Sequence, residues 1–292
     1  MKFPKAERIY LQKEIEELFT PGNAKGITNY PIRMVYRYVT RENEVEPRVK
    51  VLISVSKKRL HRAVDRVRAK RQMREAYRLT EAEIGGDDRG KLTVLNEQIG
   101  LYRKVDKPTE GLQAIEAALA LAEQFSGTIT YGTTLVNAAT AYKAFGKAAN
   151  ALPLYEKAQT VYESTLPPTD GRLGGLYNNM ALTVMELGDY AKAETLFQKA
   201  LAIMSEQENG EIEMAITYCN LADLVSAQLG TDGEKQIETY LDKAESLLDT
   251  PSLPHDGYYA FVCEKCAPTF GYYGYFLTER KLMKQAETIY ER

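Results

Sequence analysis

The feature that most constrains the fold is an internal repeat in residues 91–292. The segment NNMALTVMELGDYAKAETLFQKAL (178–201) matches NAATAYKAFGKAANALPLYEKAQ (137–159) at a shift of 42 residues. The recurring positions are Ala139/Ala181, Gly146/Gly188, Ala151/Ala193, Tyr155/Phe197 and Ala158/Ala200. Further copies are expected around Ala118, around Gly230 and Ala244, and around Ala286 and Tyr290.

This pattern predicts stacked pairs of helices. Small residues at fixed places let two helices approach closely, a large residue one turn later fills the remaining space, and glycine ends the first helix. One such pair cannot bury its apolar face alone, so successive pairs must pack on one another. We therefore expect an all-α solenoid of about five helix pairs over residues 91–292.

These residues resemble the tetratricopeptide repeat family, in the 42-residue variety seen in kinesin light chains. The resemblance implies an inner groove that binds a protein or peptide. Asn137, Asn179 and Asn220 share one register on the first helices, where such side chains can hydrogen-bond the backbone of an extended peptide. The alternative is that these asparagines only tolerate exposure or cap a turn. Lysines of a carboxylate clamp are absent from matching positions, and the acidic balance of the region favours a basic or neutral partner.

The charge distribution separates the first part of the chain from the repeats. Residues 1–90 hold 21 Lys and Arg against 13 Asp and Glu, whereas residues 91–292 hold 17 against 27. Ten of the basic residues lie between residues 55 and 78, in VSKKRLHRAVDRVRAKRQMREAYR. So many cations on one helix repel each other, and a phosphate backbone would relieve that repulsion. This favours a nucleic-acid interface over a solvated face or one that contacts anionic lipid.

The periodicity of residues 1–84 predicts a small α+β module. Residues 5–19 have helical spacing, and Pro21 with Gly22 ends that helix. Residues 29–40 and 48–56 are typical of strands, and the basic helix follows them. The expected order is αβββα if one of these strand runs divides. The glycine-rich, charged segment 85–90 is expected to link this module to the repeats.

The order of residues in the basic stretch resembles the bacterial ribonuclease P protein component. A strand that ends in SVSKK (54–58) precedes the helix AVDRVRAKRQMREAYR (63–78). The resemblance covers residues 3–80 and implies that this helix contacts a catalytic RNA. The residues implied in RNA binding are Lys57, Lys58, Arg62, Arg66, Arg68, Lys70, Arg71 and Arg74.

The same resemblance implies a cleft between the first helix and the sheet that binds the 5′ leader of precursor tRNA. Phe19 and Tyr36 would line this leader cleft, although packing in the core explains both aromatics equally well. In the family the RNA and its metal ions supply the chemistry, so the protein is a non-catalytic subunit. Beyond the RNA and those ions, no cofactor is expected.

Two departures from the family pattern lead to a second hypothesis. Val67 stands where the family has a central asparagine, and the repeats follow residue 90 where the family continues with a strand and a closing helix. The first module is therefore expected to be incomplete, in a fusion of two fragments of natural or artificial origin. A fourth strand near residues 80–100 would contradict this hypothesis. In the competing view, the repeats are a scaffold that binds protein, and the first module is inert.

Other motifs give no chemical site. Cys263 and Cys266 form a Cys-x-x-Cys pair, but a zinc site needs two more ligands and only His255 is near in sequence. They are better explained as small residues on a repeat helix. No catalytic constellation and no phosphate-binding glycine loop is found, and neither a signal peptide nor an apolar run of membrane-spanning length is present. With three cysteines in the chain, a cytoplasmic location is the expectation.

Overall fold

The computed structural model describes Ile9 and residues 12–20, 25–29, 32–36 and 88–291. The chain divides into two compact units, and each is described by itself. The described residues of the first unit form one short helix and a strand pair, and those of the second form the helical repeats.

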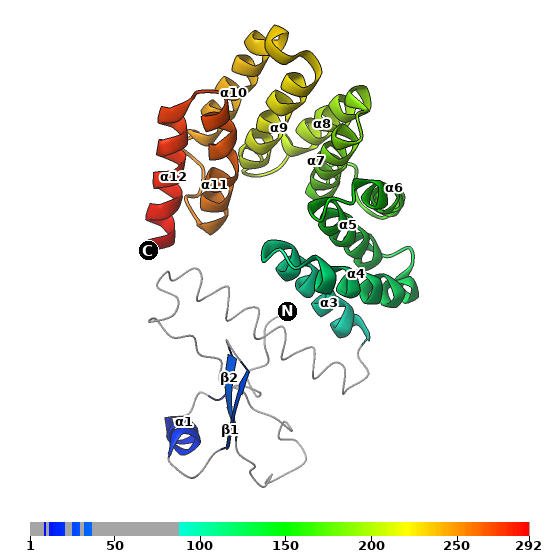
Figure 1. The fold of residues 1–292 in the computed structure, drawn as a ribbon, viewed down its shortest axis with the longest axis vertical. Coiled ribbons are helices and arrows are strands. Elements are labelled where there is room, and N and C mark those ends of the chain that lie inside the picture. The colour runs from blue at the N-terminus through cyan, green and yellow to red at the C-terminus, as the bar shows by residue number, and fades with distance from the viewer. Residues whose placement is uncertain (1–8, 10–11, 21–24, 30–31, 37–87, 292) are drawn as a thin grey trace. The chain divides into compact units, whose positions relative to one another are not determined.

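The described part of the first unit is a helix that contacts an antiparallel strand pair (Figure 1). Helix α1 (Gln12–Phe19) lies inside the predicted helix, and strand β2 (Ile32–Tyr36) lies inside the first predicted strand. Strand β1 (Lys25–Asn29) pairs with β2, with Lys25 opposite Tyr36 and Asn29 opposite Ile32. The sequence does not predict β1, because KGITN contains Gly and Asn and becomes a strand through pairing. The strand expected at 48–56 and the basic helix lie outside the described residues.

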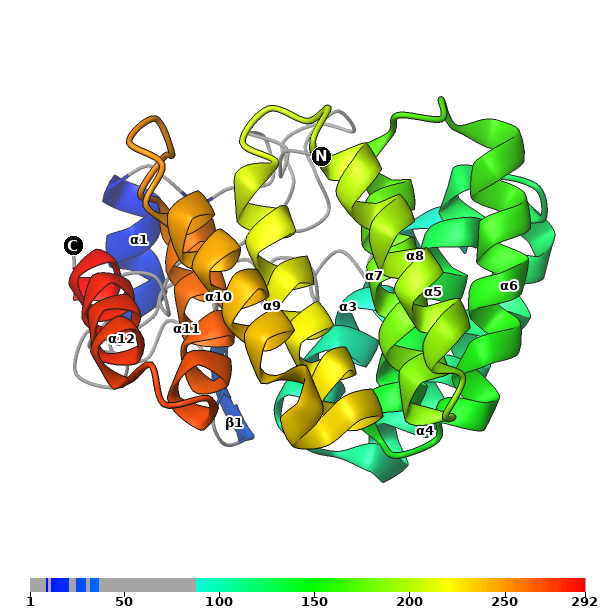
Figure 2. The same cartoon turned by 90° about the horizontal axis from the view of Figure 1, so that it is seen from above.

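The described part of the second unit, residues 88–291, consists of five helix pairs, which confirms the all-α array of paired helices predicted for residues 91–292. Each first helix also contacts the first helix of the next pair (Figure 2). Short 3-10 helices η2 (Glu123–Phe125) and η3 (Gly230–Gly233) lie between longer helices. In order, the pairs are α3 (Asp88–Lys104) with α4 (Pro108–Ala122), α5 (Ile129–Ala144) with α6 (Ala148–Thr165), α7 (Gly171–Glu186) with α8 (Tyr190–Met204), α9 (Glu211–Leu229) with α10 (Glu234–Leu248), and α11 (Gly257–Tyr272) with α12 (Phe276–Glu291).

The turn inside each pair uses one residue with positive φ. Four of these residues are glycines, including Gly146 at φ 70° and Gly188 at φ 88°, and the first is Asp106 at φ 51°. A glycine reaches this left-handed region without a steric penalty and ends the helix there. The recurring glycines of the sequence therefore mark the reversals of the chain.

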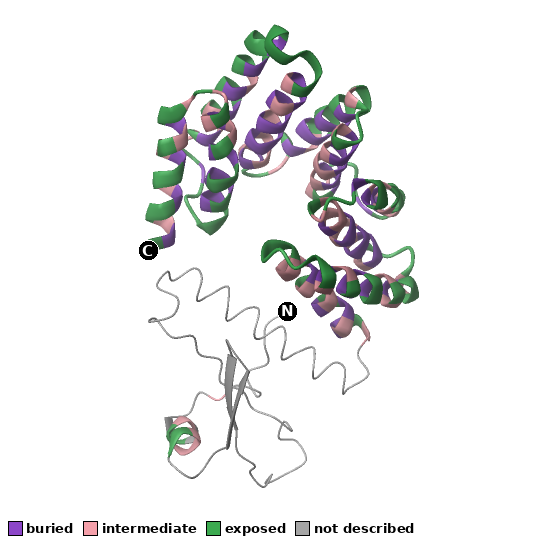
Figure 3. Ribbon diagram, viewed as in Figure 1, coloured by how far each residue is buried: buried purple, intermediate pink, exposed green. Residues whose placement is uncertain are grey.

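The recurring small residues lie where the helices of a pair meet. Ala139, Ala151 and Ala158 are 0% exposed, as are their counterparts Ala181, Ala193 and Ala200. Tyr155 and Phe197 fill the adjoining space and are also 0% exposed. Figure 3 shows buried residues along the faces by which paired helices meet. The repeat thus follows from a packing requirement of each pair.

Helix α3 begins within the segment that the sequence indicates as a linker. It starts at Asp88, and Gly90 in its first turn is already buried. Within the described part of residues 80–100, which is 88–100, the backbone is helical.

Candidate functional site

The expected RNA-binding residues lie outside the described residues. These are Lys57, Lys58, Arg62, Arg66, Arg68, Lys70, Arg71 and Arg74. Of the two expected cleft aromatics, Phe19 is the last residue of α1 and is 60% exposed, and Tyr36 is the last residue of β2. The RNA interface therefore stays a prediction.

The repeat array offers a candidate site on its first helices. In Figure 1, helices α5, α7, α9 and α11 lie on the inner side of the curved array, and α6, α8, α10 and α12 lie on the outer side. The three asparagines of the sequence pattern belong to these inner helices: Asn137 to α5, Asn179 to α7 and Asn220 to α9. Their side chains have different surroundings.

Asn137 is bonded to the preceding repeat. Its Nδ2 donates to Oδ1 of Asn96 on α3 at 3.0 Å. The amide of Asn96 in turn donates to Oγ1 of Thr134 at 2.9 Å and to the carbonyl of Leu92 at 3.0 Å. This amide pair ties α3 to α5.

Asn220 makes the same kind of contact two repeats further along the chain. Its Nδ2 donates to Oδ1 of Asn178 on α7 at 2.9 Å, and the hydroxyl of Thr217 donates to the same oxygen at 3.3 Å. Asn220 is only 9% exposed. Since an amide buried in this way needs its partner, Asn220 stabilises the contact between α7 and α9.

Asn179 lies in the same register without such a bond. Asn137 and Asn220 each donate to an asparagine on the preceding first helix, whereas the position on α5 one 42-residue repeat before Asn178 is Val136. Among the described residues, the side-chain amide of Asn179 has no hydrogen-bond partner, and it is half-buried. A side-chain amide offers a donor and an acceptor, which matches the needs of a peptide unit.

Sequence reasoning missed Asn96 and Asn178, the partners of the two bonded asparagines. The doubled asparagine at 178–179 was an available signal. Asn96 precedes Asn137 by 41 residues, the same separation as between Asn179 and Asn220, so the register itself was an available signal.

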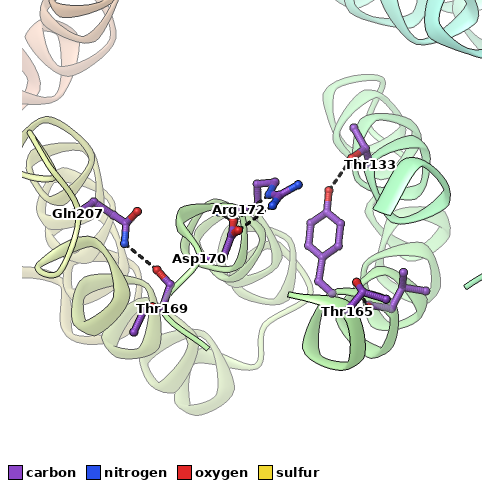
Figure 4. A network of polar contacts seen from close by, with 8 residues as sticks. Thr133, Thr165, Thr169, Asp170, Arg172 and Gln207 are labelled. Carbon is purple, nitrogen blue, oxygen red and sulfur yellow. Dashed lines mark hydrogen bonds and ion pairs between the residues drawn. The ribbon is translucent and has the colours of Figure 1, made fainter. Parts of the chain in front are cut away.

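One polar contact joins α5 to α6, and others lie at the start of α7 (Figure 4). Thr133 of α5 shares a hydrogen bond of 2.9 Å with the hydroxyl of Tyr162. The amide of Gln207 donates to the carbonyl of Thr169 at 2.6 Å. Asp170 caps α7 and binds the Arg172 guanidinium through both carboxylate oxygens, at 2.8 and 2.6 Å. The bond from Arg172 lowers the pKa of the Asp170 carboxyl.

The three cysteines belong to the interior of the last repeats. Cys219 of α9 and Cys263 and Cys266 of α11 are buried. A hydrogen bond with Cys266, together with burial, raises the pKa of Cys219, and burial raises the pKa of Cys263 to about 11. At neutral pH the thiols of Cys219 and Cys263 are therefore protonated, as expected for small core residues. No group of three or more His, Cys, Asp or Glu side chains in the described part of the chain is arranged to hold a metal ion.

Among the helices that the structure describes, none is both long enough and apolar enough to span a membrane.

Comparison with known families gives two matches. Residues 3–97 match the Ribonuclease P family, and residues 173–232 match the Tetratricopeptide repeat family. The first match ends inside α3.

Curated relatives resemble only the first part of the chain. A ribonuclease P protein component of Porphyromonas gingivalis is 46% identical over 77 residues, which are 26% of this chain and 53% of that protein. The corresponding protein of Idiomarina loihiensis is 43% identical over 76 residues, covering 24% of this chain and 59% of that protein. The chain thus spans somewhat more than half the length of the curated relatives it matches.

Solved structures resemble the repeat array in fold. BtubC (BKLC) from P. vanneervenii superposes with a TM-score of 0.53 at 16% identity, covering 75% of this chain and 89% of that one. NprR in complex with its cognate peptide NprX superposes with a TM-score of 0.52 at 15% identity, covering 74% and 60%. These likenesses show that the array shares its fold of paired, stacked helices with these proteins.

Proposed function

We propose that this chain, which carries a ribonuclease P protein domain in residues 3–97 and tetratricopeptide repeats after it, joins an RNA-binding subunit to a peptide-binding scaffold. The first part would bind a ribonuclease P RNA and precursor tRNA, and the RNA would cleave the 5′ leader. The array would hold a partner protein through an extended peptide segment. The chain itself would supply no catalytic residue.

The observation that carries the RNA proposal is the family match together with the basic stretch inside it. The match covers all eight basic residues singled out from the sequence. Lysine and arginine that neutralise phosphates release counterions, so binding of this kind weakens steeply with salt. We assign Arg66, Arg68 and Arg71 to contacts with RNA phosphates, and Phe19 and Tyr36 to the leader cleft.

This proposal is tested by titrating a bacterial ribonuclease P RNA with the full chain and with an Arg66→Ala, Arg68→Ala, Arg71→Ala triple variant. The variant should bind more weakly, and the slope of log affinity against log salt should become shallower by about 2 to 3. A matched variant removes three exposed lysines of the array, Lys192, Lys235 and Lys284, and should keep the slope of the parent chain.

Weak binding that is equal in the parent chain and the arginine variant would contradict the RNA proposal. It would favour the competing view, in which the repeats are the working part and the first module is an inert or artificially fused fragment. The departure at Val67 is the reason to keep this view.

The peptide proposal depends on the contrast among the three asparagines. Asn137 and Asn220 are committed to amide pairs within the array, while Asn179 keeps its amide free of described partners. We propose that Asn179 hydrogen-bonds the backbone of an extended peptide on the inner side of the array. The similar fold of NprR, solved with its peptide NprX, supports this function.

The test uses a library of randomised, fluorescein-labelled dodecapeptides selected on the full chain. Asn179→Ala should weaken the selected peptides about tenfold, equal to about 1.4 kcal/mol, since a peptide hydrogen bond is lost. Asn150→Ala, on the exposed face of the outer helix α6, is the matched control and should bind normally. A library without enriched peptides, or enriched peptides indifferent to Asn179→Ala, would refute the assignment.

A further inference from the structure

One side of α11 carries exposed aromatic residues. Tyr258 and Phe261 are each 46% exposed and Tyr272 is 79% exposed. With 3.6 residues per turn, these positions lie on one side of the helix, opposite its buried face. The rings of Tyr258 and Phe261 stack with centroids 6.1 Å apart and an interplanar angle of 24°. Side chains of this kind, gathered on one helix side, are typical of an interaction surface.

Two carboxylates of the neighbouring helix α9 border this side. The hydroxyl of Tyr258 donates to Oε1 of Glu213, and the hydroxyl of Tyr273 donates to Oδ1 of Asp223 at 3.0 Å. Burial raises the pKa of both carboxyl groups, and Lys265 lowers that of Glu213 only in part. Both groups are thus partly removed from water while each has a neutral hydroxyl as its hydrogen-bond donor.

Some other carboxylates between helices of the array have a cation as a partner. On α10 and the loop after it, Glu245 and Asp249 pair with Lys281 of α12 at 3.5 and 2.5 Å. Among the described residues, neither Glu213 nor Asp223 forms such an ion pair. A carboxylate that is partly desolvated without a cation gains more from binding one than a solvated carboxylate does.

We propose that this acidic–aromatic surface, made of Tyr258, Phe261 and Tyr272 of α11 and of Glu213 and Asp223 of α9, binds a basic peptide segment. The two carboxylates pair with arginine or lysine side chains, and the tyrosine and phenylalanine rings contact their cationic groups and their aliphatic stems. The inference rests on the proposed peptide-binding function and adds the chemical class of the partner. It also assigns the basic part of the partner to the α9–α11 end of the inner helices.

The charge of the surface decides between classes of partner. Nucleic acid and anionic lipid both carry negative charge and are repelled by Glu213 and Asp223. A purely apolar segment would leave both carboxylates desolvated without compensation. A basic segment satisfies the carboxylates and the aromatic rings at the same time.

The test uses four fluorescein-labelled peptides of one Ala/Ser sequence that differ only in carrying arginine, lysine, glutamine or glutamate at the same positions. Fluorescence polarisation with the full chain should show that the arginine and lysine peptides bind about tenfold more tightly than the glutamine peptide. The glutamate peptide should bind most weakly. Equal binding of all four peptides would overturn the inference.

Two variants localise the binding. Glu213→Gln with Asp223→Asn keeps acceptors for both tyrosine hydroxyls and should abolish most of the preference for basic peptides. Phe261→Ala removes an exposed ring and should weaken the same peptides without loss of the fold. The matched control, Glu194→Gln with Glu206→Gln, removes two exposed acids elsewhere and should change nothing. If the control loses as much affinity for the basic peptides as the test variants do, the net charge of the protein alone explains the binding, and the inference is overturned.

The two proposals for the array fail in different ways. Library peptides that depend on Asn179 but show no basic residues and ignore the Glu213 and Asp223 variants would refute this inference alone. Basic peptides that depend on Glu213 and Asp223 but ignore Asn179→Ala would refute the role of Asn179 alone.

Discussion

At the scale of single residues, the array repeats a position with a large ring between small neighbours. Tyr155 and Phe197 occupy this position in successive repeats, and both are 0% exposed. The Tyr155 hydroxyl shares a hydrogen bond of 2.8 Å with Oγ1 of Thr140, so the polar group is satisfied inside the core. Burial raises the pKa of Tyr155 to about 12.

This raised pKa predicts a loss of stability at alkaline pH. The folded value lies above the value of about 10 for an unfolded chain, so the contribution is complete below pH 10 and is lost as pH rises towards 12. When the pH is raised from 10 to 12, the free energy of unfolding should fall in both proteins. The fall should be about 2 to 3 kcal/mol smaller in Tyr155→Phe than in the parent chain, because the variant has no hydroxyl to ionise. At neutral pH it should cost about 1 kcal/mol, because the bond to Thr140 is gone. Urea titrations at several pH values check this, and parallel pH curves for the two proteins would contradict it.

At the scale of helices, local capping explains where several of them begin. Asp189 precedes α8, and its Oδ1 accepts from the backbone N–H of Lys192 at 3.0 Å. Asp170 and Asp256 act in the same way at α7 and α11. These aspartates follow turns in the sequence, so helix starts are among the features that could be predicted locally.

The cap at α8 yields a prediction with a close control. Asp189→Ala should lower the free energy of unfolding by about 1 kcal/mol, since the backbone amide of Lys192 loses its acceptor. Asp189→Asn keeps a good capping oxygen, so its free energy of unfolding should lie within about 0.3 kcal/mol of that of the parent chain. Thermal unfolding followed by circular dichroism distinguishes the two. Equal melting temperatures for the Ala and Asn variants would show that the cap makes no measurable contribution to stability.

At the scale of the whole array, α9 joins two hydrophobic clusters. Its Leu221 and Leu224 belong to the cluster of the preceding helices, whereas its Ala215 and Cys219 belong to the cluster with α10 to α12. A helix that is shared in this way couples the stability of the two ends, because each repeat is stabilised mainly by its neighbours.

Removing a side chain from this shared helix should affect both ends. Leu221 is 1% exposed, so Leu221→Ala should cost about 2 to 5 kcal/mol and raise the hydrogen-exchange rates of amides in α5 and in α11 together. Leu277→Ala on α12, where the side chain is 83% exposed, is the matched control and should change stability little. Faster exchange confined to the helices before α9 would show that the clusters unfold independently.

The fusion hypothesis also belongs to the scale of the whole chain. The Ribonuclease P match extends to residue 97 and therefore includes the first ten residues of α3, from Asp88 onward. The match to the first family thus ends within the first helix of the array. The RNA titration of parent and variant chains tests whether the first module binds RNA in this setting.

The sequence by itself determined the helix pairs, their turns and their small contact residues. Each of these depends on residue chemistry within one repeat. The residue types alone therefore predict that Ala139 lies at a close helix contact, that Gly146 ends a helix and that Tyr155 fills the core. The order of residues in the basic stretch likewise pointed to the Ribonuclease P family before any comparison. The sequence pattern did not predict strand β1, because its residues have a weak strand preference that pairing with β2 overrides.

Only the tertiary structure decided which asparagine has an amide without a partner among the described residues. Asn137, Asn179 and Asn220 are equivalent in sequence, but their partners lie on the preceding helix about one repeat away, where packing sets the distance. The same holds for Glu213 and Asp223, whose burial and tyrosine contacts arise where α9 and α11 meet. Contacts between repeats depend on how the helices stack, which the pattern within one repeat does not specify.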